Sequence, residues 1–278
     1  MQDRKAVWPW AVAGVLVLGG VAWWLFRDDL RTVATATSPF AAQPSAGGSR
    51  IVPPTGVPQD APAMTTAPAG YPLPRDAAID AALPSLDDSD ARVREDLGTL
   101  FPEPVLALLL PDHLVQRLVT HIDNLTQASA PASALALRPV PGSLQVEGDA
   151  ATGIAVASGN AARYAPYVTA FTAADADALA AAYMRLYPLV QQAYRELGHP
   201  GGHFNDRLVG VIDHLLQAPE PVQPPALERD ERGRYRFVDP DLQARSIGQK
   251  ALLRLDPEQA RAVKRQLRAI RQAITRGG

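Results

Sequence analysis

The sequence predicts a mainly α-helical globular domain with one or two small β-hairpins, carried on an N-terminal transmembrane helix and a disordered linker. Three observations support this prediction. An uncharged apolar run fills residues 8–26, a Pro-, Ala- and Thr-rich stretch follows over residues 27–75, and apolar side chains then recur at helical spacing through much of residues 76–278. Residues 1–7 would form a short cytoplasmic tail.

The apolar run is long enough to be a membrane anchor. At about 1.5 Å of rise per residue it spans a hydrocarbon core of about 30 Å. Tryptophan rings prefer the headgroup level, and the run has them at both ends: Trp8, Trp10, Trp23 and Trp24. A cleaved signal peptide is the alternative, but its apolar region is usually shorter, and the nearest Ala-x-Ala (Ala34, Ala36) lies well beyond the run. We therefore expect an uncleaved single-pass anchor in an inner membrane.

The linker is expected to be a semi-stiff, disordered tether. Residues 32–75 contain only three charged side chains, Arg50, Asp60 and Arg75, and too few large apolar ones to form a core. Arg4 and Lys5 before the span favour a cytoplasmic N-terminus only slightly, because Arg27 and Arg31 follow it. With the tether, this favours a periplasmic C-terminal domain.

Cap residues and apolar spacing predict the first helices of the domain. Ser89 or Asp90 is expected to cap a helix through Val93 and Leu97. Asp112 is expected to cap a second helix, whose apolar side chains are Leu114, Leu118, Ile122 and Leu125.

The later helices follow from similar signals. Thr172 and Asp175 resemble a capping box that opens a helix to residue 197, with a kink or break at Pro188 and a C-cap at Gly198. Further helices are expected over residues 204–217, 239–255 and 256–276, the last starting at Asp256-Pro257-Glu258. Weak alternation around glycines predicts hairpins within residues 144–156 and 227–238.

Several runs of residues resemble a known family. They are Leu83-Pro84-Ser85-Leu86, Ile122-Asp123-Asn124-Leu125, Arg163-Tyr164-Ala165-Pro166-Tyr167, Ala193-Tyr194-Arg195-Glu196-Leu197-Gly198, Phe204-Asn205-Asp206-Arg207-Leu208 and Gly248-Gln249-Lys250. Over about residues 80–275 the chain resembles domain-of-unknown-function family 3014, proteobacterial proteins with one N-terminal span. Leu255-Asp256-Pro257 departs from the expected methionine-glycine turn. The resemblance implies a membrane-anchored envelope protein and assigns no activity.

The sequence lacks the common catalytic and cofactor motifs. No Gly-x-Ser-x-Gly elbow, phosphate-binding loop, dinucleotide fingerprint or His-Glu-x-x-His occurs, and the absence of cysteine excludes thiol catalysis. No cofactor and no metal are therefore expected, and a net charge of −2 gives no general footprint for nucleic acid.

A polar cluster is the first candidate site. It comprises His203, Asn205, Asp206, Arg207, Asp213 and His214, with His199 just upstream. These groups could bind a divalent ion, but the spacing is not typical of a metal site. The structural alternative is that Asn205 or Asp206 caps the helix while Arg207 and Asp213 form buried ion pairs, so that Asp213→Ala would cost roughly 3 to 5 kcal/mol.

The second candidate is an aromatic strip of Tyr183, Tyr187 and Tyr194, which share a helical face. If exposed, it could stack on sugar rings or anchor a protein interface. If buried, it lines the edge of the core.

The third candidate is the basic face of the last helix. Residues 76–241 contain 23 acidic and 12 basic side chains, whereas residues 242–278 contain 2 acidic and 9 basic ones. Five of the basic residues fall along one face: Arg261, Lys264, Arg265, Arg268 and Arg271. The helix could dock by its apolar face while its charges offset the acidic body, contact anionic lipid or wall polymer, or bind an acidic partner.

Two classes of function follow. The first is a non-catalytic membrane-tethered module that binds another envelope protein or the cell wall. The alternative is a wall- or lipid-modifying hydrolase that uses dispersed carboxylates such as Glu196, Asp206 and Asp213, and it would need a pocket in which those carboxylates converge.

Overall fold

The computed structural model describes residues 68–74, 80, 82–131, 134–138, 140, 142–149, 153–231 and 233–276. The predicted tail (1–7), the membrane span (8–26) and most of the predicted linker (27–75) lie outside these residues. Across the part of the chain that is described, no helix is both long and apolar enough to cross a membrane. These residues comprise most of the predicted globular domain together with residues 68–74 of the predicted linker.

The domain is mainly helical, as the sequence predicts. The helices are α3 (Asp90–Gly98), α4 (Glu103–Leu106), α5 (Leu114–Asn124), α6 (Asn160–Thr172), α7 (Ala176–Glu196), α8 (Phe204–Leu216), α9 (Pro240–Gln243), α10 (Ile247–Leu253) and α11 (Pro257–Thr275). Helices α4 and α6 are additions to the sequence prediction. One large apolar core joins most of the helices.

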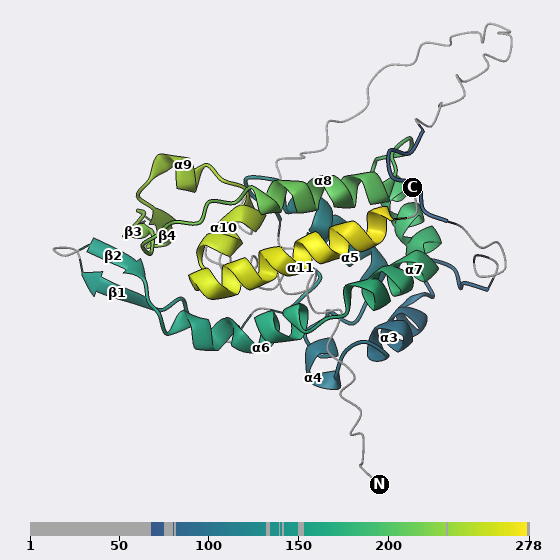
Figure 1. Cartoon of the computed structure of the whole chain (residues 1–278), viewed down its shortest axis with the longest axis horizontal. Coiled ribbons are helices and arrows are strands. Elements are labelled where there is room, and N and C mark those ends of the chain that lie inside the picture. Colours follow the sequence, from purple (N-terminus) through teal and green to yellow (C-terminus); the bar gives the residue numbers. More distant parts are fainter. Residues whose placement is uncertain are drawn as a thin grey trace, which may run out of the picture.

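Helix α11 is central to this core. It packs against α6, α7 and α8, and Figure 1 shows it crossing the middle of the domain with α8 and α6 on either side. Asp256 caps α11 as predicted, because its carboxylate accepts a hydrogen bond from the Glu258 amide at 2.8 Å. The side chains that face the core are buried at helical spacing: Val263, Leu267, Ile270 and Ile274. The predicted docking of this helix by its apolar face is therefore present.

Helix α7 starts at a different cap from the one predicted. Asp175 caps it by accepting from the Ala178 amide at 2.8 Å, whereas Thr172 ends α6 and donates its hydroxyl to the Val168 carbonyl. Pro188 lies inside α7 without dividing it, because tertiary packing of the flanking turns outweighs one lost backbone bond. Gly198 ends this region at a φ of 113°, which favours glycine, as predicted.

The caps predicted for the first two helices are wrong. Ser89 occupies the N-cap position of α3, but its hydroxyl donates to the Leu86 carbonyl instead of accepting from the helix. Asp112 does not cap α5, whose N-cap position is His113 with a φ of 55°. Asp90 performs that role from α3, because its carboxylate accepts from the amides of His113 and Leu114 at 2.8 and 2.7 Å. The cap of α5 thus fastens α3 to α5.

Residues 239–255 form α9 and α10 instead of the single helix that the sequence predicts. Ser246 starts α10 by accepting from the Gln249 amide at 3.2 Å. The next two amides, of Ile247 and Gly248, donate to carbonyls just after α5, those of Gln127 and Leu125. They are therefore withdrawn from a continuous helix, which explains the break.

The two predicted hairpins join into one antiparallel sheet. It contains β1 (Val146–Asp149), β2 (Gly153–Val156), β3 (Ala226–Arg229) and β4 (Tyr235–Phe237), in the order β1-β2-β3-β4. The junction pairs Ile154 with Leu227 and Ala155 with Ala226. A second, small core lies against this sheet and consists of Val156, Leu227, Phe237 and Leu253. The sheet is thus attached to the helices through the end of α10.

Candidate functional site

The first residues of α8 hold residues 70–71, at the end of the predicted linker. Both carboxylate oxygens of Asp206 accept backbone amides, from Gly70 at 2.9 Å and from Tyr71 at 2.8 Å. Asn205, which is 1% exposed, donates to the carbonyls of Tyr71 and Ile274. Neither residue caps α8, contrary to the structural alternative above, since α8 has no side-chain cap. Asn205 and Asp206 instead fasten residues 70–71 against α8 and α11.

Arg207 joins α8 to the end of α5. Its guanidinium donates to the Asp123 carboxylate at 2.6 Å, to the Asp123 carbonyl at 2.6 Å and to the Thr126 hydroxyl at 2.7 Å. A positive charge beside the last carbonyls of a helix is favourable. The same carboxylate lies 3.6 Å from His199 Nε2. Arg207 is therefore engaged in an ion pair, as the structural alternative predicts, but the pair is half-buried instead of buried.

Asp213 and His214 face different elements. Asp213 pairs with Arg271 of α11 at 2.6 and 3.0 Å, but the two side chains are 42% and 33% exposed, so this pair is not buried as predicted. His214 Nε2 lies 2.8 Å from the Ser246 hydroxyl. Burial, together with the positive charges of Arg207 and Arg245, lowers the pKa of His214, which favours the neutral ring.

The turn before α8 is held by a residue that the sequence did not single out. Gln191 of α7 is 5% exposed and accepts from the Phe204 amide at 2.8 Å. It also donates to the Gly202 carbonyl at 2.7 Å and accepts from the Tyr187 hydroxyl at 2.9 Å. His203 is the N-cap residue of α8 by position, with no cap bond from its side chain. A glutamine in mid-helix gives no sequence signal for such a role.

The six residues of the polar cluster thus do not converge on one point. Within the described ranges, no group of three or more His, Asp or Glu residues is placed to hold a metal ion. The three carboxylates of the hydrolase alternative are also apart: Asp206 holds residues 70–71, Asp213 pairs with Arg271, and Glu196 accepts from Gln192 at 2.9 Å. None of the three lines the small apolar pocket between the central helices or the larger pocket beside the start of α11.

The aromatic strip lies in the core and at its edge. Tyr194 is 6% exposed, stacks on His199 at a centroid distance of 4.4 Å and meets Phe204 edge-on at 5.4 Å. Tyr183 and Tyr187 meet edge-on at 5.6 Å. Burial, with smaller effects from the nearby Tyr187 and Asp206, raises the pKa of Tyr183 well above its ordinary value. Tyr183 also lines an apolar pocket of about 140 Å³ between the central helices. The three rings do not form an exposed row.

The basic face of α11 divides into two kinds of residue. Lys264 is 3% exposed and donates to the Ala218 carbonyl at 2.6 Å and to Glu220 at 2.7 Å, and Arg271 pairs with Asp213. Arg261, Arg265 and Arg268 are exposed at spacings of four and three residues. We call these three residues the arginine row. In the described part of the chain, no carboxylate lies within ion-pair distance of the arginine row.

Electrostatics link one acid to the arginine row. The pKa of Glu220 is lowered, first by the hydrogen bond and charge of Lys264 and then by the charges of Arg261 and Arg268. Glu220 therefore offsets part of the positive field at this end of the row, while Lys264 is its direct partner.

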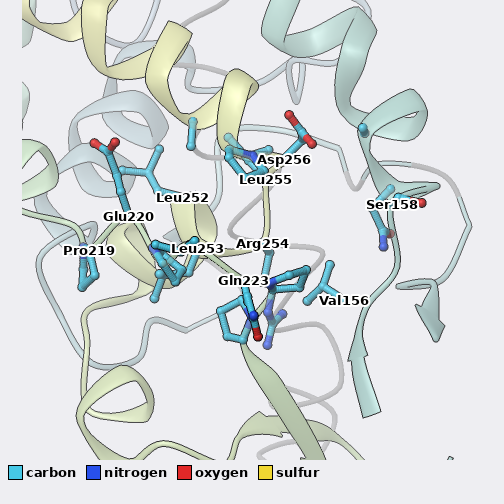
Figure 2. A pocket seen from close by; sticks show the side chains of 18 of the residues that line it. Val156, Ser158, Pro219, Glu220, Gln223, Leu252, Leu253, Arg254, Leu255 and Asp256 are labelled. Atoms are coloured by element: carbon cyan, nitrogen blue, oxygen red, sulfur yellow. The ribbon is translucent and has the colours of Figure 1, made fainter. Parts of the chain in front are cut away.

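A pocket that the sequence did not reveal lies beside the start of α11. Its volume is about 470 Å³. Figure 2 shows side chains from the sheet, the start of α6, residues 219–225 and the α10–α11 loop around it, among them Val156, Ser158, Gln223 and Arg254. Because four distant segments contribute, no local motif could have indicated it.

Comparison with known proteins gives a family and no nearer relative. No curated protein matches the chain, and no solved structure matches it. The family described as "Protein of unknown function (DUF3014)" matches residues 114–271, from the start of α5 to the last turns of α11. That segment contains α8, the four-stranded sheet and the arginine row, and it lies within the range over which the sequence resembles this family. The chain belongs to family DUF3014.

Proposed function

We propose that this protein is a non-catalytic, membrane-tethered module of the bacterial envelope that binds another envelope protein through the arginine row of α11. In this proposal residues 8–26 anchor the chain in the inner membrane, residues 27–75 form the tether, and the domain lies in the periplasm. The observation that carries the proposal is the exposed arginine row, which is set on a helix whose opposite face is fixed in the core.

The rigidity of α11 supports a role in recognition. Its buried side contacts three other helices, so the arginine side chains project from a fixed backbone. Arginine is enriched at protein interfaces, where its planar guanidinium binds carboxylates with two hydrogen bonds. A row of charges also speeds the encounter with an acidic partner. The arginine row thus suits an acidic protein surface.

The contacts of the acidic residues support the non-catalytic part of the proposal. A general acid or base must reach a substrate in a pocket. Asp206 and Asp213 are instead committed to backbone amides and to an arginine, and Glu196 to a neighbouring glutamine. A tether strengthens weak binding without any catalytic step. It confines the domain to a shell near the membrane, and this raises the effective concentration of the domain around a partner.

In-cell crosslinking of the full-length anchored protein tests this function. The test variant carries Arg261→Gln, Arg265→Gln and Arg268→Gln and leaves the buried Lys264 unchanged. A matched control loses the same charge elsewhere on the exposed surface, through Arg195→Gln, Arg229→Gln and Arg236→Gln. We expect one or two specific envelope proteins to be recovered with the native chain and the control, and to be lost with the test variant.

Other outcomes would contradict the proposal. Recovery of the same partners with the test variant would show that the arginine row is not part of the interface. Recovery of wall fragments without a protein would replace the proposed partner by a polymer. Both variants should first be shown to have the same melting temperature as the native chain, so that loss of a partner cannot be attributed to misfolding.

A further inference from the structure

The arginine row begins at the edge of a pocket. Arg261, its first member, is exposed and lines the pocket of about 470 Å³ beside the start of α11. Arg265 and Arg268 follow at about 6 and 10 Å along the helix axis, since each residue of an α-helix rises by about 1.5 Å. The row and the pocket therefore adjoin one another and can contact the same partner.

The base of this pocket is apolar. The buried apolar side chains of its lining include Val156, Leu252, Leu253 and Leu255. Figure 2 shows Ser158 on one side of the pocket and Pro219 on the other, with leucines of the α10–α11 region between them. The volume lies within the range of about 300 to 1,000 Å³ that is typical of ligand pockets, so the pocket can admit a large apolar side chain.

The segment 219–225 forms a stiff outer wall. It contains prolines at positions 219, 221, 224 and 225, and proline fixes φ. Its first half is tied to α11, because Lys264 donates to the Glu220 carboxylate at 2.7 Å, and its end continues into β3 at Ala226. A wall held in this way loses little conformational entropy when a partner binds. Val222 of this segment is 98% exposed and adds an apolar side chain to the outer surface.

Charges of both signs already surround the pocket. Glu220 pairs with Lys264, and Asp256 is the N-cap of α11. Arg254 is 4% exposed, and its guanidinium carbon lies 5.6 Å from the centre of an aromatic ring, so it is part of the wall. Glu147 of β1, the remaining acid of the lining, is exposed. The pocket therefore suits an uncharged apolar group, whereas the arginine row beside it suits acids.

We propose that this surface binds an acidic amphipathic helix of the partner protein. The helix lies along α11, with carboxylates on the arginine row and one large apolar side chain in the pocket. The inference rests on the proposed function and adds the chemistry of the partner. A second helix has the same rise per residue, so it can place acids opposite all three arginines. An apolar side chain that fills a pocket commonly dominates the binding energy, and the charges fix the register.

A designed peptide tests this recognition. The probe is a fluorescent, hydrocarbon-stapled alanine-based helix with three Glu at the spacing of the arginine row and a Phe four residues before the first of them. Its reversed sequence provides the opposite direction along α11. Binding to the full-length chain in nanodiscs of neutral lipid is measured by fluorescence anisotropy. We expect one direction to bind, and expect replacement of the Phe by Ala, or of the three Glu by Gln, to weaken binding by about tenfold or more.

Variants of the chain locate the two contacts. The arginine test variant should weaken binding of the peptide by about tenfold or more, because it removes all three partners of the Glu residues. Ser158→Trp fills the pocket from an exposed position of its lining. It should weaken the Phe peptide to the same extent and leave the Ala peptide unchanged. Gln192→Trp adds the same bulk at an exposed position of α7 that lines neither pocket, and should change nothing.

The in-cell crosslinking separates failure of this inference from failure of the proposed function. Ser158→Trp should lose the same envelope proteins as the arginine test variant, and Gln192→Trp should keep them. If only the arginine test variant loses them, the pocket is not part of the interface, and this inference alone is overturned. If the arginine test variant keeps them, the proposed function fails as well. Equal binding of the Gln peptide would overturn the acidic partner, and absence of binding in both directions would overturn the helix.

Discussion

The carboxylate of Asp213 faces the guanidinium of Arg271 with two hydrogen bonds, and this pair joins α8 to α11 at the surface of the domain. A pair of the same geometry in the interior would be expensive to break, because a buried charge would be left alone. Here the side chains are 42% and 33% exposed, so water solvates either charge when the other is removed.

We therefore expect Asp213→Ala to lower the free energy of unfolding by only about 0.5 to 1 kcal/mol. Urea unfolding of the full-length chain in mild detergent, followed by circular dichroism, measures this loss. The loss should shrink at about 1 M salt, since exposed pairs are screened. A loss of 3 to 5 kcal/mol, insensitive to salt, would mean that the pair is desolvated in solution.

Gly248 lies where helix α10 touches the end of α5. A Cβ atom there would come within 2.8 Å of the Leu125 carbonyl oxygen and closer still to the Leu215 side chain. Leu215 can rotate, but the backbone at Leu125 cannot move without losing its bond to the Gly248 amide. We expect Gly248→Ala to destabilise the domain by about 1 to 3 kcal/mol.

Gly210 of α8 is the control for this prediction. A Cβ at Gly210 would meet nothing within 4 Å. Gly210→Ala should therefore leave stability unchanged or raise it by up to about 1 kcal/mol through helix propensity. Thermal unfolding of the two variants distinguishes close packing from a general effect of added methyl groups. Equal melting temperatures would contradict the close approach at Gly248.

Asp90 and Asp112 offer a similar pair of substitutions. Asp90 accepts the first amides of α5, whereas the Asp112 side chain is exposed and does not cap the helix. Asp90→Ala should cost about 1 to 2 kcal/mol, the usual worth of an N-cap, and Asp112→Ala should cost almost nothing. If urea unfolding showed a larger loss of stability for Asp112→Ala than for Asp90→Ala, Asp112 would be the cap of α5, as the sequence predicts.

His121 makes the stability of the domain depend on pH. It is 2% exposed, and burial lowers its pKa to about 4, against a smaller opposing effect of a hydrogen bond with the Ala134 backbone. In the unfolded chain its pKa is about 6.5. Between these values the unfolded state binds a proton that the folded state does not. The contribution of His121 to the free energy of unfolding is therefore fully present above about pH 6.5 and is lost as the pH drops toward 4. The full loss is about 3 kcal/mol.

Replacement of His121 separates this effect from other titrations, including that of His214, whose pKa is also lowered. The Asn of His121→Asn can keep a donor toward the Ala134 backbone and does not titrate. We expect the unfolding free energies of the native chain and the variant to converge as the pH falls from 7 to 4.5. Parallel profiles would show that His121 is not buried in its neutral form.

The sequence predicted best those elements whose signals are local. The start of α11 follows from Asp256-Pro257-Glu258, and its buried side follows from apolar spacing within one helix. The break between α9 and α10 was missed because it depends on carbonyls after α5, far away in the chain. The joining of the two hairpins likewise depends on β2 and β3, which are separated by α6, α7 and α8.

The same distinction explains the candidate sites. Helical spacing places Lys264 with the arginines, but the Ala218 carbonyl and Glu220 hold it in the interior. Ion pairs of Arg207 and Asp213 were expected and are present, but Asp206 does not cap α8: its partners are the amides of residues 70–71, more than 130 positions earlier. Arg254 carries no local signal, because its surroundings come from separate segments.

The hydrogen bonds from the amides of residues 70–71 to Asp206 fix the point at which the predicted tether leaves the domain. Asp206→Ala removes the acceptor of two amides, whereas Tyr71 would keep its carbonyl bond from Asn205, its contact with Arg271 and its packing against the core. We expect hydrogen exchange at Gly70 and Tyr71 to accelerate by at least about tenfold, because local opening becomes easier. Global stability should fall by no more than about 1 to 2 kcal/mol, since the core is unchanged. Glu196→Ala, an exposed carboxylate on α7, is the control and should alter neither quantity. If exchange at residues 70–71 were as fast in the native chain as in the variant, the segment would not be held in solution, and the tether would begin after it, closer to α3.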